Sequence, residues 1–235
     1  MLSWSSHPAC RYGGCMKVIS FVNQKGGTGK SMLAINIAVA AEGTGERACL
    51  VDLDPQGTVS NWFDTRTAET PPVVSYESAT DLTRTLTALE KAGFTLVIID
   101  TKGEDGHATR AAMREADLCL IPVRPAGPDL HATRTTMDAL RTMRRDFALV
   151  VNQATPNKAA KLTSAVMAGL AQSGTVVPIP LASRMDFQYS YALGQGVAEH
   201  APSSKAAEEI AELWAWCRKR INKEKNGEQQ ERRRA

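Results

Sequence analysis

The sequence of 235 residues lacks several features that would place a protein in a membrane or a secreted compartment. No apolar run approaches the roughly 20 residues that a helix needs to span a bilayer. The first fifteen residues are too polar for the apolar region of a signal peptide. The five cysteines are an odd number and include no pair of CxxC motifs of the kind that binds zinc. These absences favour a globular protein of a reducing cytoplasm.

The two ends of the chain differ in composition from the part between them. Residues 1–15 precede a second methionine, Met16, which stands directly before the first apolar run. We expect 1–15 to be a leader or a non-native extension, with a short partner-binding arm as the alternative. Residues 16–221 are expected to form one domain, since no long linker or 20–50-residue repeat divides them. Residues 222–235 are expected to be a polar, basic and disordered tail.

The net charge of +3 is unevenly distributed along the chain. Residues 218–235 hold eight basic and three acidic residues, whereas the rest of the chain holds 20 basic and 22 acidic ones. The basic C-terminal segment is either a solvated tail or a sequence-independent electrostatic contact with DNA.

Short apolar segments alternate with helical patterns along the domain. This alternation predicts an α/β fold, with a mostly parallel twisted sheet and helices on both faces. The segment 94–99 is almost wholly apolar, as expected of a central strand covered on both faces. Ligands in such sheets bind at the carboxyl ends of the strands. The predicted strands are 17–22, 47–52, 94–99, 118–123, 147–151 and, more weakly, 175–179, and the predicted helices are 31–42, 80–92, 107–115, 129–145, 159–172 and 205–221.

A glycine-rich segment, QKGGTGKS, joins the first predicted strand to the first predicted helix. Glycines let the backbone curl so that its N–H groups point inward and form an anion site at a helix N-terminus. Lysine in this motif reaches the β- and γ-phosphates, and the following hydroxyl binds Mg²⁺. The first glycine of the usual GxxxxGK[ST] pattern is replaced by Gln24. The residues that we expect around the phosphates are Lys25, Gly26, Gly27, Thr28, Gly29, Lys30 and Ser31.

Acidic residues follow two of the predicted strands. The segment VDLDPQG places Asp52 and Asp54 at one strand end, where proline and glycine turn the chain away. The apolar segment LVIID ends in Asp100. A carboxylate at such a strand end holds Mg²⁺ or orients an attacking water. We therefore expect Asp54 and Asp100, with the hydroxyl of Ser31, to form a metal site.

The combination of KGGTGKS with its extra lysine, DLDPQG and VIID resembles the ParA/MinD family of deviant-Walker ATPases, from residue 16 to about residue 220. Within that family the chain is most similar to short ParA proteins, which lack an N-terminal DNA-reading domain. The resemblance implies a P-loop NTPase fold and a homodimer that closes face to face around two ATP molecules with Mg²⁺. The implied catalytic residues are Lys25, which reaches the partner's phosphates, Lys30, which binds phosphate in its own subunit, Asp54, which orients the hydrolytic water, and Asp100, the Walker B residue.

The same resemblance implies a site for the base of the nucleotide. Asn152 resembles the family residue that hydrogen-bonds adenine, although asparagine at a strand end is also an ordinary turn former. Pro178 and Pro180 lie in the segment that resembles the loop beside the base.

A set of basic residues resembles the non-specific DNA-binding residues of ParA proteins. The layout of IPLASR, a short helix and GVAEHAPSSKAAEEI follows the family, and two of the basic residues lie within it. All of them could form one patch on the ATP-bound dimer, or they could be scattered and solvated. The candidate DNA contacts are Arg184, Lys205, Arg218, Lys219 and Arg220.

Two sequence features each allow more than one interpretation. Lys102 stands where this family commonly has a proline after the Walker B strand, and it could pair with a carboxylate or alter a switch loop. The apolar helix 210–221, with Trp214 and Trp216, is expected to cover the sheet rather than to face a partner.

These features together predict a cytoplasmic, nucleoid-associated ATPase that segregates or positions a plasmid, a chromosome or a protein cluster. Hydrolysis would be slow until an adaptor or centromere-binding protein stimulates it, and DNA would be held through phosphates rather than bases. A MinD-like membrane-cycling ATPase is the alternative. It would need an amphipathic membrane helix, for which the C-terminal NKEKNGEQQERRRA has almost no apolar residues, so no stable membrane association is expected.

The cysteines bear on whether the chain is an iron–sulfur protein of the same fold. Such a relative would need cluster cysteines after the Walker B strand, where only Cys119 lies. Cys49 and Cys119 are both inside apolar runs and are expected in the core, while Cys10 and Cys15 are a weaker candidate for a metal site. A nucleotide-gated binding protein that barely hydrolyses ATP is also compatible with the motifs.

Overall fold

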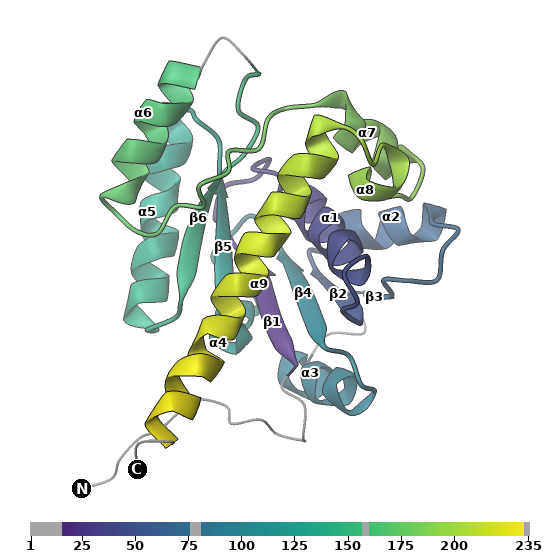
Figure 1. Cartoon of the computed structure of the whole chain (residues 1–235). Helices are drawn as coiled ribbons and strands as arrows, with labels where there is room; N and C mark the ends of the chain where they lie inside the picture. Colours follow the sequence, from purple (N-terminus) through teal and green to yellow (C-terminus); the bar gives the residue numbers. More distant parts are fainter. Residues whose placement is uncertain (1–15, 76–80, 157–159, 233–235) are drawn as a thin grey trace, which may run out of the picture.

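The computed structural model describes residues 16–75, 81–156 and 160–232, which contain a six-stranded sheet with helices on both sides (Figure 1). All strand pairs are parallel, in the order β3-β2-β4-β1-β5-β6. The predicted α/β fold is therefore confirmed. The strands are β1 (Lys17–Phe21), β2 (Ala48–Leu53), β3 (Val73–Val74), β4 (Leu96–Thr101), β5 (Leu118–Val123) and β6 (Phe147–Val151).

Helices cover the two faces of the sheet in separate groups. One core contains side chains of α1, α2, α7, α8 and α9, and the other contains side chains of α3, α4, α5 and α6. Figure 1 shows α9 crossing the sheet face beside α1. The helices are α1 (Lys30–Glu42), α2 (Thr58–Thr65), α3 (Leu82–Lys91), α4 (His107–Glu115), α5 (Gly127–Thr142), α6 (Ala160–Ala171), α7 (Met185–Ala192), α8 (Val197–His200) and α9 (Lys205–Arg232).

Alternate side chains of a strand enter opposite cores, as the pleat requires. In β1, Ile19 is buried on the α1 side and Val18 on the α4 side. All six residues of β4 are buried, which agrees with the expected central strand. Cys49 and Cys119 are both buried in the second core, as predicted, and burial raises the pKa of each thiol to about 12.

The strand order reverses at β1, because the chain passes from β1 to β2 on one side and from β4 to β5 on the other. Such a reversal opens a crevice at the carboxyl ends of the strands, where α/β proteins bind ligands. The register places Asp100 of β4 beside Phe21 of β1 and beside Asp52 of β2. The polar residues that follow β1, β2 and β4 therefore lie together at the carboxyl ends of the strands.

Some local elements of the structure differ from the prediction. The expected strand 175–179 contributes only one parallel bridge, between Leu149 and Val176. Pro178 and Pro180 lack the N–H groups that a continued ladder would need, so the segment does not extend the sheet. The short elements α2 and β3 were not predicted, since neither is long enough to show a periodic pattern.

Helix α9 covers the sheet and is longer than expected. Trp214 is buried, and its indole nitrogen donates a hydrogen bond to Thr44 Oγ1 at 2.8 Å, while Trp216 packs against the same core. The expected covering role of this helix is confirmed. The helix extends to Arg232, beyond the expected end near residue 221. The added stretch is rich in Lys, Glu, Gln and Arg, which have high helix propensity. No helix among the described residues is both long enough and apolar enough to cross a membrane.

Candidate functional site

The glycine-rich segment forms the turn between β1 and α1. Gly27 and Gly29 have φ angles of +74° and +91°, a region that strongly favours glycine. Asn23 is buried beneath the turn; its amide donates to the Pro122 carbonyl at 2.8 Å, and its Oδ1 accepts from the Lys25 backbone N–H at 3.0 Å. Asn23 therefore links the turn to β5.

The first turn of α1 offers positive charge and backbone donors. Gly29 is the N-cap and provides no side chain to accept from the first backbone N–H groups. Such N–H groups bind anions readily. Lys30 is 7% exposed; its burial lowers the pKa of its ammonium group, and the charges of Asp100 and Asp54 oppose that shift. A buried ammonium group beside a helix N-terminus is suited to an anionic ligand.

The two aspartates of DLDPQG have different surroundings. Asp52 is fully buried: its Oδ1 accepts from the Asp54 N–H at 3.1 Å, and its Oδ2 accepts from the N–H and hydroxyl of Ser60 at 3.0 Å. Asp52 thus fixes the turn and the first turn of α2. Asp54 is partly exposed and lines the pocket described below. Of the two carboxylates, Asp54 is the one available to a ligand.

Asp100 is the last but one residue of β4 and is 0% exposed. Neither of its carboxylate oxygens has a hydrogen-bond partner among the described residues. Burial raises the pKa of Asp100 to about 7; the Ser31 side chain nearby opposes this without reaching good hydrogen-bond geometry, and the charge of Asp52 adds to it. Burying an unpartnered carboxylate is costly, and the groups around it fit a bound cation. The oxygen ligands available here, from Ser31, Asp54 and Asp100, suit Mg²⁺.

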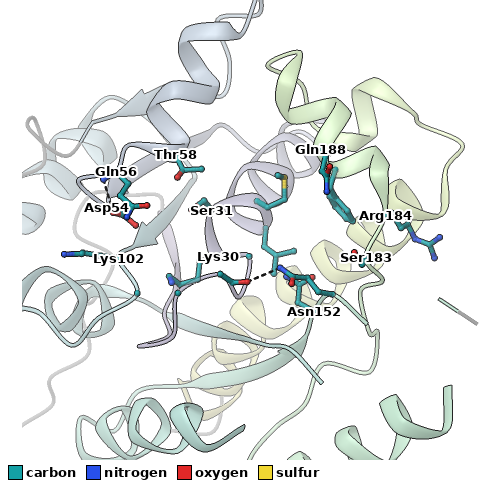
Figure 2. A pocket seen from close by; sticks show the side chains of 18 of the residues that line it. Lys30, Ser31, Asp54, Gln56, Thr58, Lys102, Asn152, Ser183, Arg184 and Gln188 are labelled. Atoms are coloured by element: carbon teal, nitrogen blue, oxygen red, sulfur yellow. Dashed lines mark hydrogen bonds between the residues drawn. The ribbon is translucent and has the colours of Figure 1, made fainter. Parts of the chain in front are cut away.

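A pocket of about 610 Å³ lies between the glycine-rich turn and the segment that follows β6. Figure 2 shows Asp54 and Lys102 at one end of the pocket, Asn152 and Arg184 toward the other, and Lys30 between them. The predicted nucleotide-site residues that line it are Gly26, Gly27, Gly29, Lys30, Ser31, Asp54 and Asn152, and Arg184, which was predicted as a DNA contact, lines it as well.

The other predicted nucleotide residues do not line this pocket. Thr28 and Asp100 are buried behind it, and Lys25 is exposed outside it. Pro178 and Pro180 are not among the lining residues either. The chain returns to this pocket at Ala182, which pairs with Ala154 in a parallel bridge, and the role of Pro178 and Pro180 beside the base stays a prediction. The lining residues that were missed include Gln56, Thr58, Ala182, Ser183, Phe187 and Gln188.

Asn152 is in contact with the phosphate loop itself. Its amide nitrogen donates to the Thr28 carbonyl at 2.8 Å, and a Cβ at Gly29 would collide with that nitrogen. The neighbouring Gln153, at φ +54°, donates to the Gly27 carbonyl at 3.2 Å. In this structure Asn152 therefore positions the loop, and its role at the base stays a prediction.

The five candidate DNA contacts do not form one patch within a single chain. Along α9, Lys205 and Arg220 are about 22 Å apart at 1.5 Å per residue. Three of the five basic groups are ion-paired: Arg184 with Glu209, Lys205 with Glu208 and Arg220 with Asp146. Arg218 and Lys219 are exposed near the Arg220 end. In the isolated chain α9 separates these residues into two groups, and a single patch on the ATP-bound dimer stays a prediction.

The carboxyl end of β4 brings Lys102 to the same site. Its ammonium group lies 2.9 Å from Glu104 Oε2, so the predicted pairing with a carboxylate is confirmed. Gly103 follows it directly beneath the phosphate loop, where a Cβ would lie 3.0 Å from the backbone of Gly26.

Comparison with known proteins agrees with this arrangement. The family model described as the CobQ/CobB/MinD/ParA nucleotide binding domain matches residues 19–190. The chain is 40% identical over 85 residues to the maintenance of carboxysome distribution protein A of Gloeobacter kilaueensis, covering 36% of this chain and 38% of that protein. It is 49% identical over 45 residues to the chromosome partitioning protein ParA of Caulobacter vibrioides, covering 19% and 17%. The aligned parts thus span well under half of each relative.

A solved structure extends the similarity to the whole fold. The septum site-determining protein MinD of Pyrococcus horikoshii, solved with Mg-ADP, superposes with a TM-score of 0.68. That superposition covers 85% of this chain and 94% of the other at 17% identity, which shows a shared fold.

Proposed function

Because the chain belongs to the CobQ/CobB/MinD/ParA nucleotide-binding domain family, we propose that it is a ParA-type ATPase whose ATP-bound dimer holds DNA and positions a cargo. The observation that carries the proposal is the buried carboxylate of Asp100, which has no hydrogen-bond partner among the described residues and lies near Lys30, behind a glycine-lined pocket. The carboxylate is suited to bind Mg²⁺, and the buried ammonium group is suited to bind the phosphates of a nucleotide.

The residues of one subunit have different roles in phosphoryl transfer. The first N–H groups of α1 and the ammonium group of Lys30 hold the phosphates and stabilise charge as it develops. Ser31, Asp54 and Asp100 would hold Mg²⁺, which supplies charge neutralisation at the phosphates. Asp54 faces the pocket from a turn fixed by Asp52, and it orients the attacking water.

The second subunit completes the site in this proposal. Lys25 is exposed at the mouth of its own phosphate loop, and its side chain does not line the pocket of its own chain. An exposed lysine there is able to reach phosphates that are presented by a facing copy. The nucleotide thereby becomes part of the contact between two copies of the chain.

Binding to DNA is the proposed output of the ATP-bound dimer. Arg218 and Lys219 are exposed on α9 and are the first candidates for phosphate contacts. Arg184, Lys205 and Arg220 join them only by leaving their carboxylate partners. The named roles of two relatives, in carboxysome distribution and chromosome partitioning, support a positioning function in the cytoplasm on the nucleoid. The stimulating partner is proposed to be an adaptor or a centromere-binding protein.

The test is a DNA-binding titration with ATP, ADP and no nucleotide at two salt concentrations. We expect tight binding only with ATP, and a steep loss at the higher salt, because phosphate contacts release counterions. Lys30→Ala removes the buried cation and should abolish both ATP binding and the ATP-dependent DNA retention.

Matched variants distinguish the role of the basic surface of α9 in DNA binding from the role of the nucleotide site. Arg218→Ala combined with Lys219→Ala should weaken DNA binding and leave ATP binding intact, whereas Arg110→Ala, an exposed arginine on α4, should change neither. Equal DNA retention by Lys30→Ala without nucleotide would overturn the proposal. So would ATP-dependent binding to anionic vesicles in the absence of any binding to DNA.

A further inference from the structure

Lys102 lies between two pockets at the carboxyl end of β4. It lines the pocket that contains Lys30 and Asp54, and it also lines a neighbouring pocket of about 700 Å³ beside α3 and α4. Among the residues that the structure describes, it is the one that contributes to the lining of both. A change in the position of its side chain therefore alters both spaces.

The backbone on either side of Lys102 is fixed against the phosphate loop. Thr101 is fully buried, and its hydroxyl donates to the Phe21 carbonyl at 2.8 Å, directly before that loop begins. Gly103 lies so close to the loop that a Cβ would approach Gly26 Cα and N to 3.0 Å. The backbone of Lys102 is thus held in place on both sides, and its neighbour Gly103 is in close contact with the phosphate loop.

The ion pair that Lys102 makes in this structure is a weak one. Its ammonium group lies 2.9 Å from Glu104 Oε2, and the two side chains are 41% and 55% exposed. Exposed ion pairs contribute little, because water screens the charges and both side chains lose freedom. A lysine on a flexible four-carbon stem can leave such a partner for a more highly charged anion.

The position of Lys102 along the pocket determines which phosphate of a bound nucleotide its ammonium group can reach. Figure 2 shows Lys102 on the Asp54 side of Lys30, away from Asn152 and Arg184. Asp54 is the residue that the proposed function places at the attacking water, which must lie beside the terminal phosphate. Lys102 is therefore at the end of the pocket that ATP fills and ADP leaves empty.

We propose that Lys102 is a same-chain ligand of the terminal phosphate, which it binds in exchange for Glu104 when ATP rather than ADP is present. This inference rests on the proposed function, because it assigns the nucleotide's terminal phosphate to the Asp54 end of the site. The exchange frees Glu104 in the turn before α4, so that this turn and the neighbouring pocket differ between the ATP and ADP states. Lys102 acts within its own subunit and is distinct from Lys25.

The test compares the affinities for ADP and for a non-hydrolysable ATP analogue, measured by displacement of a fluorescent ADP. In Lys102→Ala we expect about tenfold weaker binding of the ATP analogue, the range of a lost charge-assisted hydrogen bond, with ADP binding unchanged. Lys102→Arg should restore most of the preference for the ATP analogue. Glu104→Gln should strengthen binding of the ATP analogue by roughly twofold to threefold, because it removes the competing carboxylate.

Arg141→Ala is the matched control, since Arg141 is also an exposed basic residue paired with a carboxylate, that of Asp138, and lies outside both pockets. It should change neither affinity. Equal losses for both nucleotides in Lys102→Ala, or an unchanged ratio in both Lys102→Ala and Glu104→Gln, would overturn the inference while leaving the ATP site in place. Failure of the unaltered protein to bind either nucleotide would overturn the proposed function first.

Discussion

Two aspartates separated by one residue have opposite roles in this molecule. Asp52 uses its carboxylate to accept from three donors of its own turn and of Ser60, so it holds the backbone. Asp54 accepts one N–H, from Gln56 at 3.0 Å, and keeps a face toward the pocket. Asp52 is the last but one residue of β2 and points into the fold, whereas Asp54 follows the end of β2 at Leu53, so its direction is set by the turn and not by the strand.

This difference predicts two distinct mutant phenotypes. Asp54→Asn should bind ATP with near-normal affinity but hydrolyse it about 100-fold more slowly, because the water loses its orienting carboxylate. Asp52→Asn should instead lower the free energy of unfolding by about 1–3 kcal/mol, since a buried acceptor set is left incomplete. Single-turnover hydrolysis and urea titration measure the two effects. Equal stability losses in both variants would contradict the division of roles.

At the scale of elements, α2 is tied to the segment that carries α7 and α8. The Arg66 guanidinium donates to Glu199 at 2.7 and 2.8 Å and to the Gly194 carbonyl at 2.8 Å. Gly194 has φ +64°, and a Cβ there would lie 2.5 Å from the Arg66 backbone. Tyr191 also donates to the Thr58 carbonyl at 3.0 Å. Since Thr58 lines the pocket, these contacts connect α7 and α8 to the turn that carries Asp54.

The connection predicts a pH-dependent loss of stability in Glu199→Gln. Burial alone would raise the pKa of Glu199, but its hydrogen bonds with Arg66 and with the Gly196 N–H lower it below the usual 4.5. A lowered pKa contributes stability above pH 4.5, and that contribution is lost as the pH falls through the folded-state value. We expect the variant to be about 1–2 kcal/mol less stable at pH 7, allowing for partial exposure. Denaturant titrations at pH 7 and pH 3.5 should show the difference shrinking toward zero at the lower pH.

At the scale of the whole molecule, one ligand site gathers segments that lie far apart in the chain. The turn after β1, the ends of β2 and β4, and the segment after β6 all contribute to one pocket. Asn152 and Thr28 are bonded across 124 positions of sequence. A ligand that bridges these segments must stabilise the fold as a whole.

Magnesium ATP should therefore raise the melting temperature. At a free concentration about 100 times its Kd, it should add about 2.7 kcal/mol, which corresponds to roughly 5–10 °C for a chain of this size. Lys30→Ala should show no such rise, and neither should ATP in excess EDTA. Differential scanning calorimetry at fixed protein concentration makes the measurement, and an equal rise with inorganic phosphate alone would contradict it.

The parts of this protein that were predictable from sequence depend on residues that are close together along the chain. The phosphate loop is a run of neighbours whose glycines dictate its curl, and Asp54 and Asp100 stand at the ends of apolar strands that must be parallel and buried. Strand order follows from the βαβ connections, which have few alternatives. The elements that the sequence analysis did not predict, or predicted where the structure has no strand, are very short, such as β3, or contain proline, such as 175–179.

The tertiary structure decided what the charged and amide side chains contact. Arg184 is paired with Glu209 and Arg220 with Asp146, and the rise of α9 separates the two pairs within one chain. Asn152 meets the phosphate loop, and Lys102 meets Glu104. Sequence determines which backbone turns and strands form, because those depend on local dihedral preference and hydrophobic pattern. The partner of a long polar side chain depends on distances between distant segments, which only the folded chain sets.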